Sequence, residues 1–523
     1  MSWTHTWSGL LLGWLLYFIF VTGTAGYLDT EIDRWMRPEM PPASPPVPLE
    51  RSASLGLAVL EERAPGARRW IINPPLGREQ PWLAARWQGA PGPGEKTGTV
   101  ELDAVGGAVL SSRETAGGQT LYRMHWVLHY MPRSVAEWIV GVATLFMLVA
   151  LVTGIVVHKK IFADFFTFRP GKGQRSWLDA HNLASVVTLP FQLMITYSGL
   201  VFMMFVYMPL IAAAHYGLDE AGRNAFRDEV FGSADRFQPT GQPSPLVPIG
   251  AVLEQTRSLW GEVPVRRIDV FHPGDAGAHI LVTGDRAASP VRSAAVLVFD
   301  GVSGELLLER PAVESSAKAV RDLLLGLHEG LFAGPLLRAL YVLSGLLGTA
   351  MIATGLVLWT VKRRQRTEKA SEAPHPGLRL AERLNVATVV GLPVAIAAYF
   401  WANRLLPVDM AGRADWEVHV MFLAWGAMFA HAALRPVARA WYEQWIIAAA
   451  AFGLLPLLNA LTTDRHLGVS VTQGDWVIAG FDLTMLAVAG GCLLAARYLG
   501  IRARGASTGT LFRPSRIARG GAE

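Results

Sequence analysis

Eight long apolar runs divide this chain, and they limit it to a membrane fold. The runs lie near residues 6–27, 137–157, 183–210, 338–361, 385–403, 417–434, 443–461 and 475–496. About 20 mostly apolar residues cross the roughly 30 Å of bilayer hydrocarbon as a helix. Only 17% of the 523 residues are charged, against about 25% in soluble proteins. The sequence therefore predicts a polytopic α-helical membrane protein with eight transmembrane helices. It excludes a purely soluble enzyme, a disordered regulator and a fibrous protein.

Basic residues gather after every second run and predict the orientation of the chain. They are Lys159, Lys160, Arg169, Lys172 and Arg175, then Lys362, Arg363, Arg364 and Arg366, then Arg435 and Arg439, and finally Arg497, Arg502 and Arg504. The positive-inside rule makes this side cytoplasmic. We therefore expect both termini in the cytoplasm of a bacterium, with the chain in the inner membrane. The isoelectric point near 9.3 follows from these clusters, so we expect membrane lipid and no nucleic acid as a partner.

This topology divides the chain into membrane, periplasmic and cytoplasmic parts. The periplasmic segments are 28–136 and 211–337, the cytoplasmic loops are 158–182 and 362–384, a four-helix extension covers 385–496, and a cytoplasmic tail covers 497–523. Each periplasmic segment is predicted to be a small α+β module. The expected helices are Pro48–Arg63 and Pro248–Leu259, the expected strands are Trp70–Asn73, Trp82–Trp87, Val265–Phe271, His279–Thr283 and Ala294–Phe299, and Asp300–Gly304 is an expected hairpin turn.

The first four runs repeat one pattern. Sixteen residues separate His5 from Thr22-Gly23, and sixteen residues separate His181 from Ser198-Gly199. Thr153-Gly154 in the second run corresponds to Thr354-Gly355 in the fourth, and Val100–Leu110 resembles Val298–Leu307. Parallel repeats of this kind predict a pseudo-twofold axis along the membrane normal.

Histidine is the candidate metal ligand, because the single cysteine, Cys492, excludes a disulfide, a cysteine-ligated zinc site and an iron–sulfur cluster. Six histidines lie at two depths: His5, His158 and His181 at the cytoplasmic ends of runs, and His125, His129 and His328 on the outer side. Each alone is compatible with an interfacial polar residue. The predicted axis, however, would bring repeat-related histidines together as axial ligands of haem.

Three alternatives remain open at this stage. His125, His129 and His328 could bind one periplasmic zinc ion, since imidazole suits zinc as well as iron. The glycines of the four Thr-Gly and Ser-Gly pairs are compatible with close helix contacts, or with room for a flat macrocycle. His419 and His431 could ligate a further haem, although they point about 120° apart around a helix. No Cys-x-x-Cys-His is present, so any haem is of the non-covalent b type.

Specific passages resemble the PepSY-associated transmembrane family. They are His5–Gly13 with Thr22-Gly23, His158–Pro170, Trp177–Asn182 and Leu189–Gly199, together with the turn Phe299–Gly304. The resemblance covers about residues 1–365 and implies periplasmic PepSY-like modules in an inner-membrane protein of iron uptake. It also implies His125, His129, His158, His181 and His328 as haem ligands, with His5 at the matching place in the first helix. Gln192 stands where many relatives would have a histidine, and Trp359 occupies the position in the second repeat that is equivalent to His158.

Two functional hypotheses follow. The first is a di-haem b reductase of ferric siderophores, with His129 and His328 on the outer haem, and His181 with His5 or His158 on the inner one. His125 would be a reserve ligand, and the electron donor would be membrane quinol or a cytoplasmic reductase. The second is a non-catalytic membrane module whose PepSY-like domains bind or regulate a periplasmic protein. A siderophore or iron permease is a third possibility, although few acidic residues lie in the predicted spans.

Overall fold

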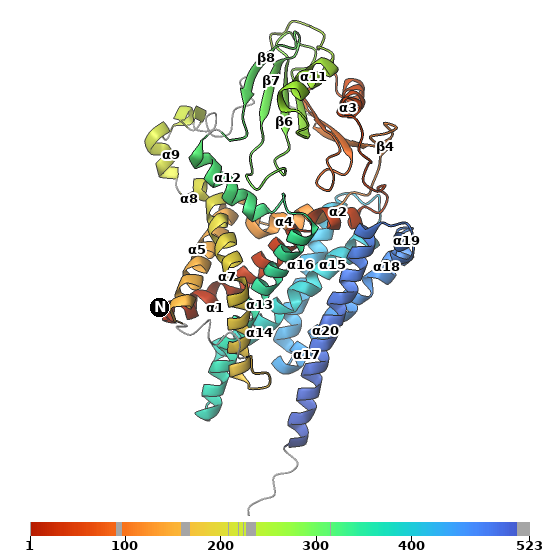
Figure 1. Ribbon diagram of the computed structural model, residues 1–523. Helices are drawn as coiled ribbons and strands as arrows, with labels where there is room; N and C mark the ends of the chain where they lie inside the picture. The colour runs from red at the N-terminus through yellow and green to blue at the C-terminus, as the bar shows by residue number, and fades with distance from the viewer. Residues whose placement is uncertain are drawn as a thin grey trace, which may run out of the picture.

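A computed structural model describes residues 2–89, 97–157, 168–207, 209–217, 219–222, 224–225, 237–313 and 315–509. Within these residues, eight helices are long and apolar enough to cross a membrane, as the sequence predicted. They are α1 (Ser2–Gly26), α5 (Arg133–Val157), α7 (Gln174–Phe202), α13 (Pro335–Lys369), α14 with α15 (Pro376–Val389 and Gly391–Leu405), α16 (Arg413–Leu434), α17 with α18 (Val437–Gly453 and Leu455–Thr462), and α20 (Trp476–Gly509). The chain is therefore a multi-pass membrane protein (Figure 1).

Several spans are longer than their apolar runs, and α7 and α13 are examples. Helix α7 begins at Gln174, so His181 lies in its second turn rather than in the predicted loop 158–182. Helix α13 continues to Lys369, so the basic cluster that follows the fourth apolar run is part of this helix. Lys, Arg and Gln are good helix formers, and cations stabilise a helix C-terminus, so both helices extend beyond the apolar segment.

Two other spans are broken into pieces. The fifth span breaks at Val390 and the seventh at Leu454. A proline, Pro393 or Pro456, lies in the first turn after each break. Proline has no N–H to donate to the preceding turn, so it suits the start of a helix better than its interior.

The segments outside the spans build one antiparallel sheet, with strand order β4-β3-β2-β1-β5-β6-β7-β8. The strands are β1 (Arg69–Asn73), β2 (Leu83–Gln88), β3 (Gly98–Leu102), β4 (Val109–Leu110), β5 (Val265–Phe271), β6 (His279–Gly284), β7 (Val296–Asp300) and β8 (Leu306–Arg310). The sequence predicted two separate modules, but β1 pairs with β5 and joins them. Each of these strands would otherwise be an unpaired edge, which is why pairing them is favourable.

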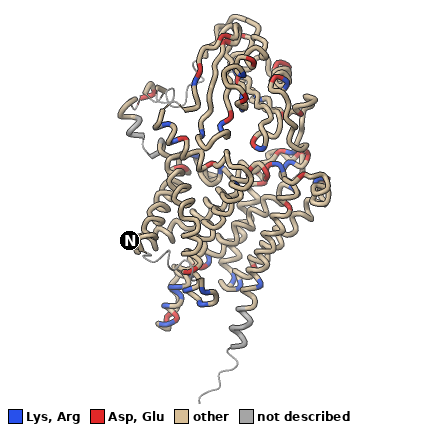
Figure 2. The backbone as a smooth tube through the Cα atoms, in the orientation of Figure 1, with Lys and Arg blue, Asp and Glu red and all other residues tan. Residues whose placement is uncertain are grey.

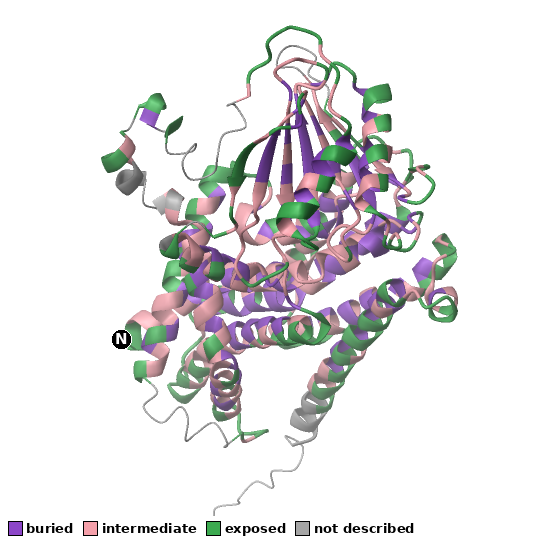
Figure 3. Ribbon diagram, turned by 45° about the horizontal axis from the view of Figure 1, so that its top comes forward, coloured by how far each residue is buried: buried purple, intermediate pink, exposed green. Residues whose placement is uncertain are grey.

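The two halves of the sheet follow the same element order. Helix α3 (Leu49–Arg63), strands β1–β4 and helix α4 (Gly117–Val127) precede α5. Helix α11 (Ile249–Trp260), strands β5–β8 and helix α12 (Ser316–Glu329) precede α13. One apolar core lies under both halves and includes Leu60, Ile72, Leu253 and Ile268, and Figure 3 shows the central strands as the buried part of this domain. The remaining helices are α2 (Asp29–Met36), α8 (Met204–Tyr207), α9 (Pro209–Tyr216) and α19 (Leu467–Thr472).

The sheet stands at one end of the helix bundle, with α4 and α12 between them (Figure 1). Helix α1 packs against α4, α5 and α13, and α7 packs against α12 and α13. Figure 2 shows Lys and Arg residues at the other end of the bundle, toward the ends of α13 and α20. The sheet domain and the basic clusters therefore lie at opposite ends.

We expect the junction between the two sheet halves to depend on Asp269. Its carboxylate is fully buried on β5 and accepts hydrogen bonds from Arg69 of β1, at 3.0 and 2.7 Å, and from Arg267, at 2.7 Å. Replacing Asp269 with alanine should destabilise the protein by about 1–3 kcal/mol, because two guanidinium groups lose their acceptor. Thermal unfolding of the purified full chain measures this. Glu254→Ala, on the exposed face of α11, is the control, and equal losses for both variants would contradict the prediction.

Candidate functional site

Four of the six predicted histidines come together in two pairs between the first four spans. His5 of α1 and His181 of α7 have ring centroids 6.3 Å apart. His125 of α4 and His328 of α12 have ring centroids 6.4 Å apart. We call these the inner pair and the outer pair. His158 lies outside the described residues.

A glycine of a neighbouring helix makes room for each ring of the inner pair. A Cβ atom added to Gly154 of α5 would lie 3.2 Å from Cε1 of His5, and one added to Gly355 of α13 would lie 3.1 Å from Cε1 of His181. Each Nδ1 lies within hydrogen-bond distance of a carbonyl oxygen one turn before that glycine, that of Ala150 at 2.9 Å or that of Met351 at 2.8 Å. The two imidazoles are thus held in the same way by equivalent helices.

The outer pair is seated on the other two glycines. A Cβ atom added to Gly23 of α1 would lie 3.6 Å from Cγ of His125, and one added to Gly199 of α7 would lie 3.3 Å from Cε1 of His328. Nδ1 of His328 lies 2.9 Å from the hydroxyl of Ser198, and Nδ1 of His125 contacts the carbonyl oxygen of Tyr122. All four motif glycines therefore lie against a histidine ring. From the sequence, these glycines were compatible either with close helix contacts or with room for a macrocycle.

The two pairs lie at different depths. His5 and Gly23 are eighteen residues apart on α1, and His181 and Gly199 are eighteen residues apart on α7. At 1.5 Å per residue this is about 27 Å along each helix, close to the thickness of the hydrocarbon layer. The inner and outer pairs are therefore widely separated along α1 and α7.

The spacing of the rings suits two ligands on opposite sides of one metal ion. An imidazole nitrogen binds a metal at about 2 Å, so two rings on opposite sides of an ion have centroids roughly 6 Å apart. A ligating histidine commonly engages its other ring nitrogen with a backbone carbonyl, which orients the ring. The described residues contain no group of three or more His, Cys, Asp or Glu side chains that could hold an ion. Each pair supplies two imidazoles, which is the number of axial ligands that a porphyrin iron takes.

Burial keeps the outer pair neutral. It lowers the pKa of His125 to about 4, and burial together with the neighbouring His125 lowers the pKa of His328 to about 3. Metal ions bind the neutral form of histidine, so neither ring has to lose a proton near neutral pH before it can act as a ligand.

His129 does not face His328, and this corrects the predicted outer pair. Helix α4 ends at Val127, and Leu128 has a φ of 54°. The chain therefore leaves the helix before His129, which is no longer one helical turn above His125 on the same face. Its ring stacks instead on Phe422 of α16, with centroids 5.7 Å apart. A zinc site made of His125, His129 and His328 is accordingly not formed.

The remaining polar candidates have other partners. His431 lies 2.9 Å from the Glu443 carboxylate through Nε2 and 3.3 Å from Gln444 through Nδ1, and Nδ1 of His419 contacts the Tyr130 hydroxyl. His419 and His431 therefore do not form a third pair. Gln192 is fully buried in α7 against Gly348, and its Oε1 atom has no hydrogen-bond partner among the described residues.

Trp359 lies in the C-terminal half of α13. The Trp359 ring lies against that of Trp7, with centroids 6.3 Å apart. The guanidinium of Arg363 lies over the Trp359 ring, 3.6 Å from its centroid. The position equivalent to His158 thus holds a cation–π contact in the second half.

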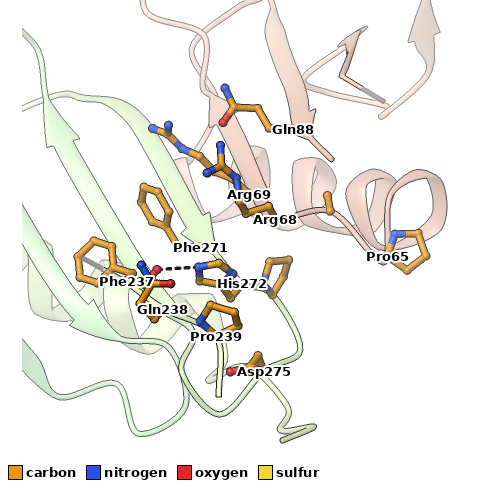
Figure 4. Close-up of a pocket in the computed structure, with 13 residues that line it drawn as sticks. Pro65, Arg68, Arg69, Gln88, Phe237, Gln238, Pro239, Phe271, His272 and Asp275 are labelled. Atoms are coloured by element: carbon orange, nitrogen blue, oxygen red, sulfur yellow. Dashed lines mark hydrogen bonds between the residues drawn. The ribbon is translucent and has the colours of Figure 1, made fainter. Parts of the chain in front are cut away.

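A separate cavity of about 450 Å³ lies in the sheet domain, where β1 begins and β5 ends (Figure 4). Arg68, Arg69 and His272 line it, and Nε of Arg68 has no hydrogen-bond partner among the described residues. Beyond the other end of β1, Arg78 bonds Glu31 beside α1. Strands rise about 3.3 Å per residue, so this cavity lies at the end of the sheet that faces away from the bundle.

Comparison with known proteins gives one match. A model of a family described as the PepSY-associated TM region matches residues 2–362, which contain both histidine pairs and the whole sheet. No curated protein matches the chain.

Proposed function

The chain belongs to the PepSY-associated TM family, and from this premise and the paired histidines we propose that it is a di-haem b ferric reductase. In this proposal it lies in a bacterial inner membrane and reduces ferric iron, held by a siderophore, on the periplasmic side. The observation that carries the proposal is the geometry of the two pairs, with ring centroids 6.3 and 6.4 Å apart and a glycine behind every ring.

Each of the two histidine pairs would hold one haem. His5 and His181 would hold the inner haem, and His125 and His328 the outer one. The carbonyl oxygens of Ala150 and Met351 orient the inner rings. A bis-imidazole haem supplies reversible one-electron exchange between ferric and ferrous iron.

The glycines of the four motifs support this proposal. A Cβ atom at Gly154, Gly199 or Gly355 would lie 3.1–3.3 Å from a histidine ring atom, closer than ordinary van der Waals contact, whereas one at Gly23 would just touch the ring of His125. The parallel repeat predicted from the sequence accounts for the arrangement, since each histidine and its glycine recur at equivalent places in both halves. The siderophore would give up its iron because a hard-oxygen chelator holds ferrous iron more weakly than ferric iron.

The orientation in this proposal rests on charge. Basic clusters lie at the end of the bundle opposite the sheet (Figure 2), and the positive-inside rule assigns that end and both termini to the cytoplasm. The sheet domain and the outer pair would then face the periplasm. The electron donor would be membrane quinol or a cytoplasmic reductase.

The proposal is tested by the haem content of the purified chain. We expect two haems b per polypeptide, with a Soret band and sharp reduced α-bands. His125→Ala and His181→Ala should each lower the content to one. His431→Ala and His272→Ala are the controls, and both should retain two haems because these side chains lie in neither pair. A colourless wild-type protein would overturn the proposal.

One observation favours the alternative, a non-catalytic module that binds a periplasmic partner. The cavity of Figure 4 lies on the sheet domain, at its end away from the bundle, and carries two arginines. It suits an anionic ligand whose binding needs no electron transfer. Haem-free protein that binds such a ligand through Arg68 would favour this alternative.

A further inference from the structure

A second cavity lies within the helix bundle. It has a volume of about 320 Å³ and lies between α1, the turn from α4 to α5, α14 and α16. Its walls are mainly aromatic: Phe18 stacks on Trp425 with centroids 5.5 Å apart, and Phe422 lies 6.2 Å from Trp425. The polar side chains on its lining are those of His129 and Thr388. A largely apolar cavity of this size with a few polar groups is typical of a small-molecule site.

The backbone turns His129 into this cavity at an energetic cost. Leu128 and Tyr130, on either side, have φ values of 54° and 65°. This left-handed conformation costs residues with a side chain about 1–2 kcal/mol each, and such strain is concentrated at functional sites. Among the described residues, the His129 ring meets the ring of Tyr130 edge-on and stacks on that of Phe422, but it makes no hydrogen bond.

A chain of titratable groups leads from His129 to the surface. The ring of His129 lies 4.2 Å from that of Tyr130, whose hydroxyl is hydrogen-bonded to Nδ1 of His419. Tyr130 is 60% exposed, and Asp415 close by is also exposed. Burial and the neighbouring His419 lower the pKa of His129, which leaves a neutral ring able to accept a proton.

The cavity is close to the outer pair along two elements. Phe18 in the cavity wall lies five residues before Gly23, the glycine that packs against His125. Five residues correspond to about 7.5 Å along α1. His129 follows His125 by four residues, beyond the end of α4. A redox-active molecule in this cavity would therefore lie beside the outer pair.

We propose that this cavity binds the ring of an isoprenoid hydroquinone from the membrane and is the site of its oxidation. The aromatic walls enclose the ring, and Nε2 or Nδ1 of His129 accepts a hydrogen bond from one hydroxyl. Oxidation of the hydroquinone to the quinone releases two electrons and two protons. The electrons reduce two ferric ions to ferrous, one each, and the two protons pass to water, the first of them by way of His129. The electron acceptor rests on the proposed function, whereas the binding site does not.

Binding is tested on the full chain in nanodiscs, with a short-chain ubiquinone as the probe. We expect saturable quenching of tryptophan fluorescence and an upward shift of the unfolding temperature. His129→Leu should raise the Kd for ubiquinone about tenfold, as expected for one lost hydrogen bond to the ligand. The control His431→Gln should bind as the wild type does. Equal, non-saturable quenching in all variants would mean that the cavity holds only lipid chains, and would overturn the inference.

Oxidation is tested by adding the matching ubiquinol to the protein without oxygen and following the reduced α-band. We expect wild-type protein to be reduced, and His129→Leu to be reduced more slowly at unchanged haem content and unchanged reduction by dithionite. Haem-loaded wild-type protein that neither binds ubiquinone nor is reduced by ubiquinol would overturn this inference but not the proposed function. Colourless protein with saturable binding would overturn the proposed function and support the cavity as a quinone site.

Discussion

Ferric reduction is expected to fall to the background of protein-free vesicles when His125 or His328 is replaced by alanine. Each ring supplies one of only two imidazoles at the outer level, with centroids 6.4 Å apart, and no third His, Cys, Asp or Glu among the described residues completes a cluster there. The loss of one ring therefore cannot be compensated by a neighbour. The measurement is the rate at which a ferric siderophore gives up iron to a ferrous-specific chelator outside proteoliposomes charged with a reductant.

The companion variants separate loss of the outer haem from loss of the fold. His431→Ala should keep wild-type activity, because its side chain pairs with Glu443 and lies in neither histidine pair. His125→Ala should keep the inner haem and its spectrum. Wild-type rates in both outer-pair variants would show that electrons leave the protein elsewhere.

Replacing Glu417 with alanine is expected to destabilise the protein by about 3–5 kcal/mol, the cost of leaving a buried charge without its partner. Glu417 and Arg413 of α16 are both fully buried and form an ion pair at 2.5 Å. The Glu417 carboxylate also accepts hydrogen bonds from Asn403 at 2.7 Å and from the hydroxyl of Thr115 at 2.7 Å. It thus joins the C-terminal helices to the segment that enters α4.

Thermal unfolding of the purified protein in detergent measures this loss. Glu443→Ala is the matched control, because Glu443 also forms ion pairs with arginines, but the side chains of those arginines, Arg435 and Arg439, are 40% and 64% exposed. Exposed ion pairs contribute little to stability, so the control should unfold close to the wild-type temperature. A similar decrease of the unfolding temperature in both variants would contradict the prediction that the buried ion pair stabilises the protein more than the exposed one.

The depth of each histidine could be predicted from the sequence, but the partner of His328 could not. The offset between the equivalent glycines Gly154 and Gly355 is 201 residues. The offsets from His129 and His125 to His328 are 199 and 203 residues, so the repeat favours neither. The choice depends on where α4 ends, and the left-handed residue Leu128 after Val127 sets that end.

The joined sheet and the cavity around His129 were also beyond prediction from the sequence. Strand periodicity shows that β1 and β5 exist, but their pairing connects residues 69–72 with residues 268–271. The cavity brings α1 together with α16, and Phe18 with Trp425. No local pattern encodes contacts across several hundred residues.

The amino-acid sequence alone was sufficient for the eight spans, for most strand positions and for the residue types that make up both histidine pairs. These features follow from the cost of placing polar groups in hydrocarbon and from the period of each element, which are local properties of the chain. The tertiary structure was needed to assign His125 to His328, to join the two halves of the sheet and to direct His129 into its own cavity. These outcomes depend on how helix ends and strand edges meet in space, where a change of one or two residues turns a side chain to another neighbour.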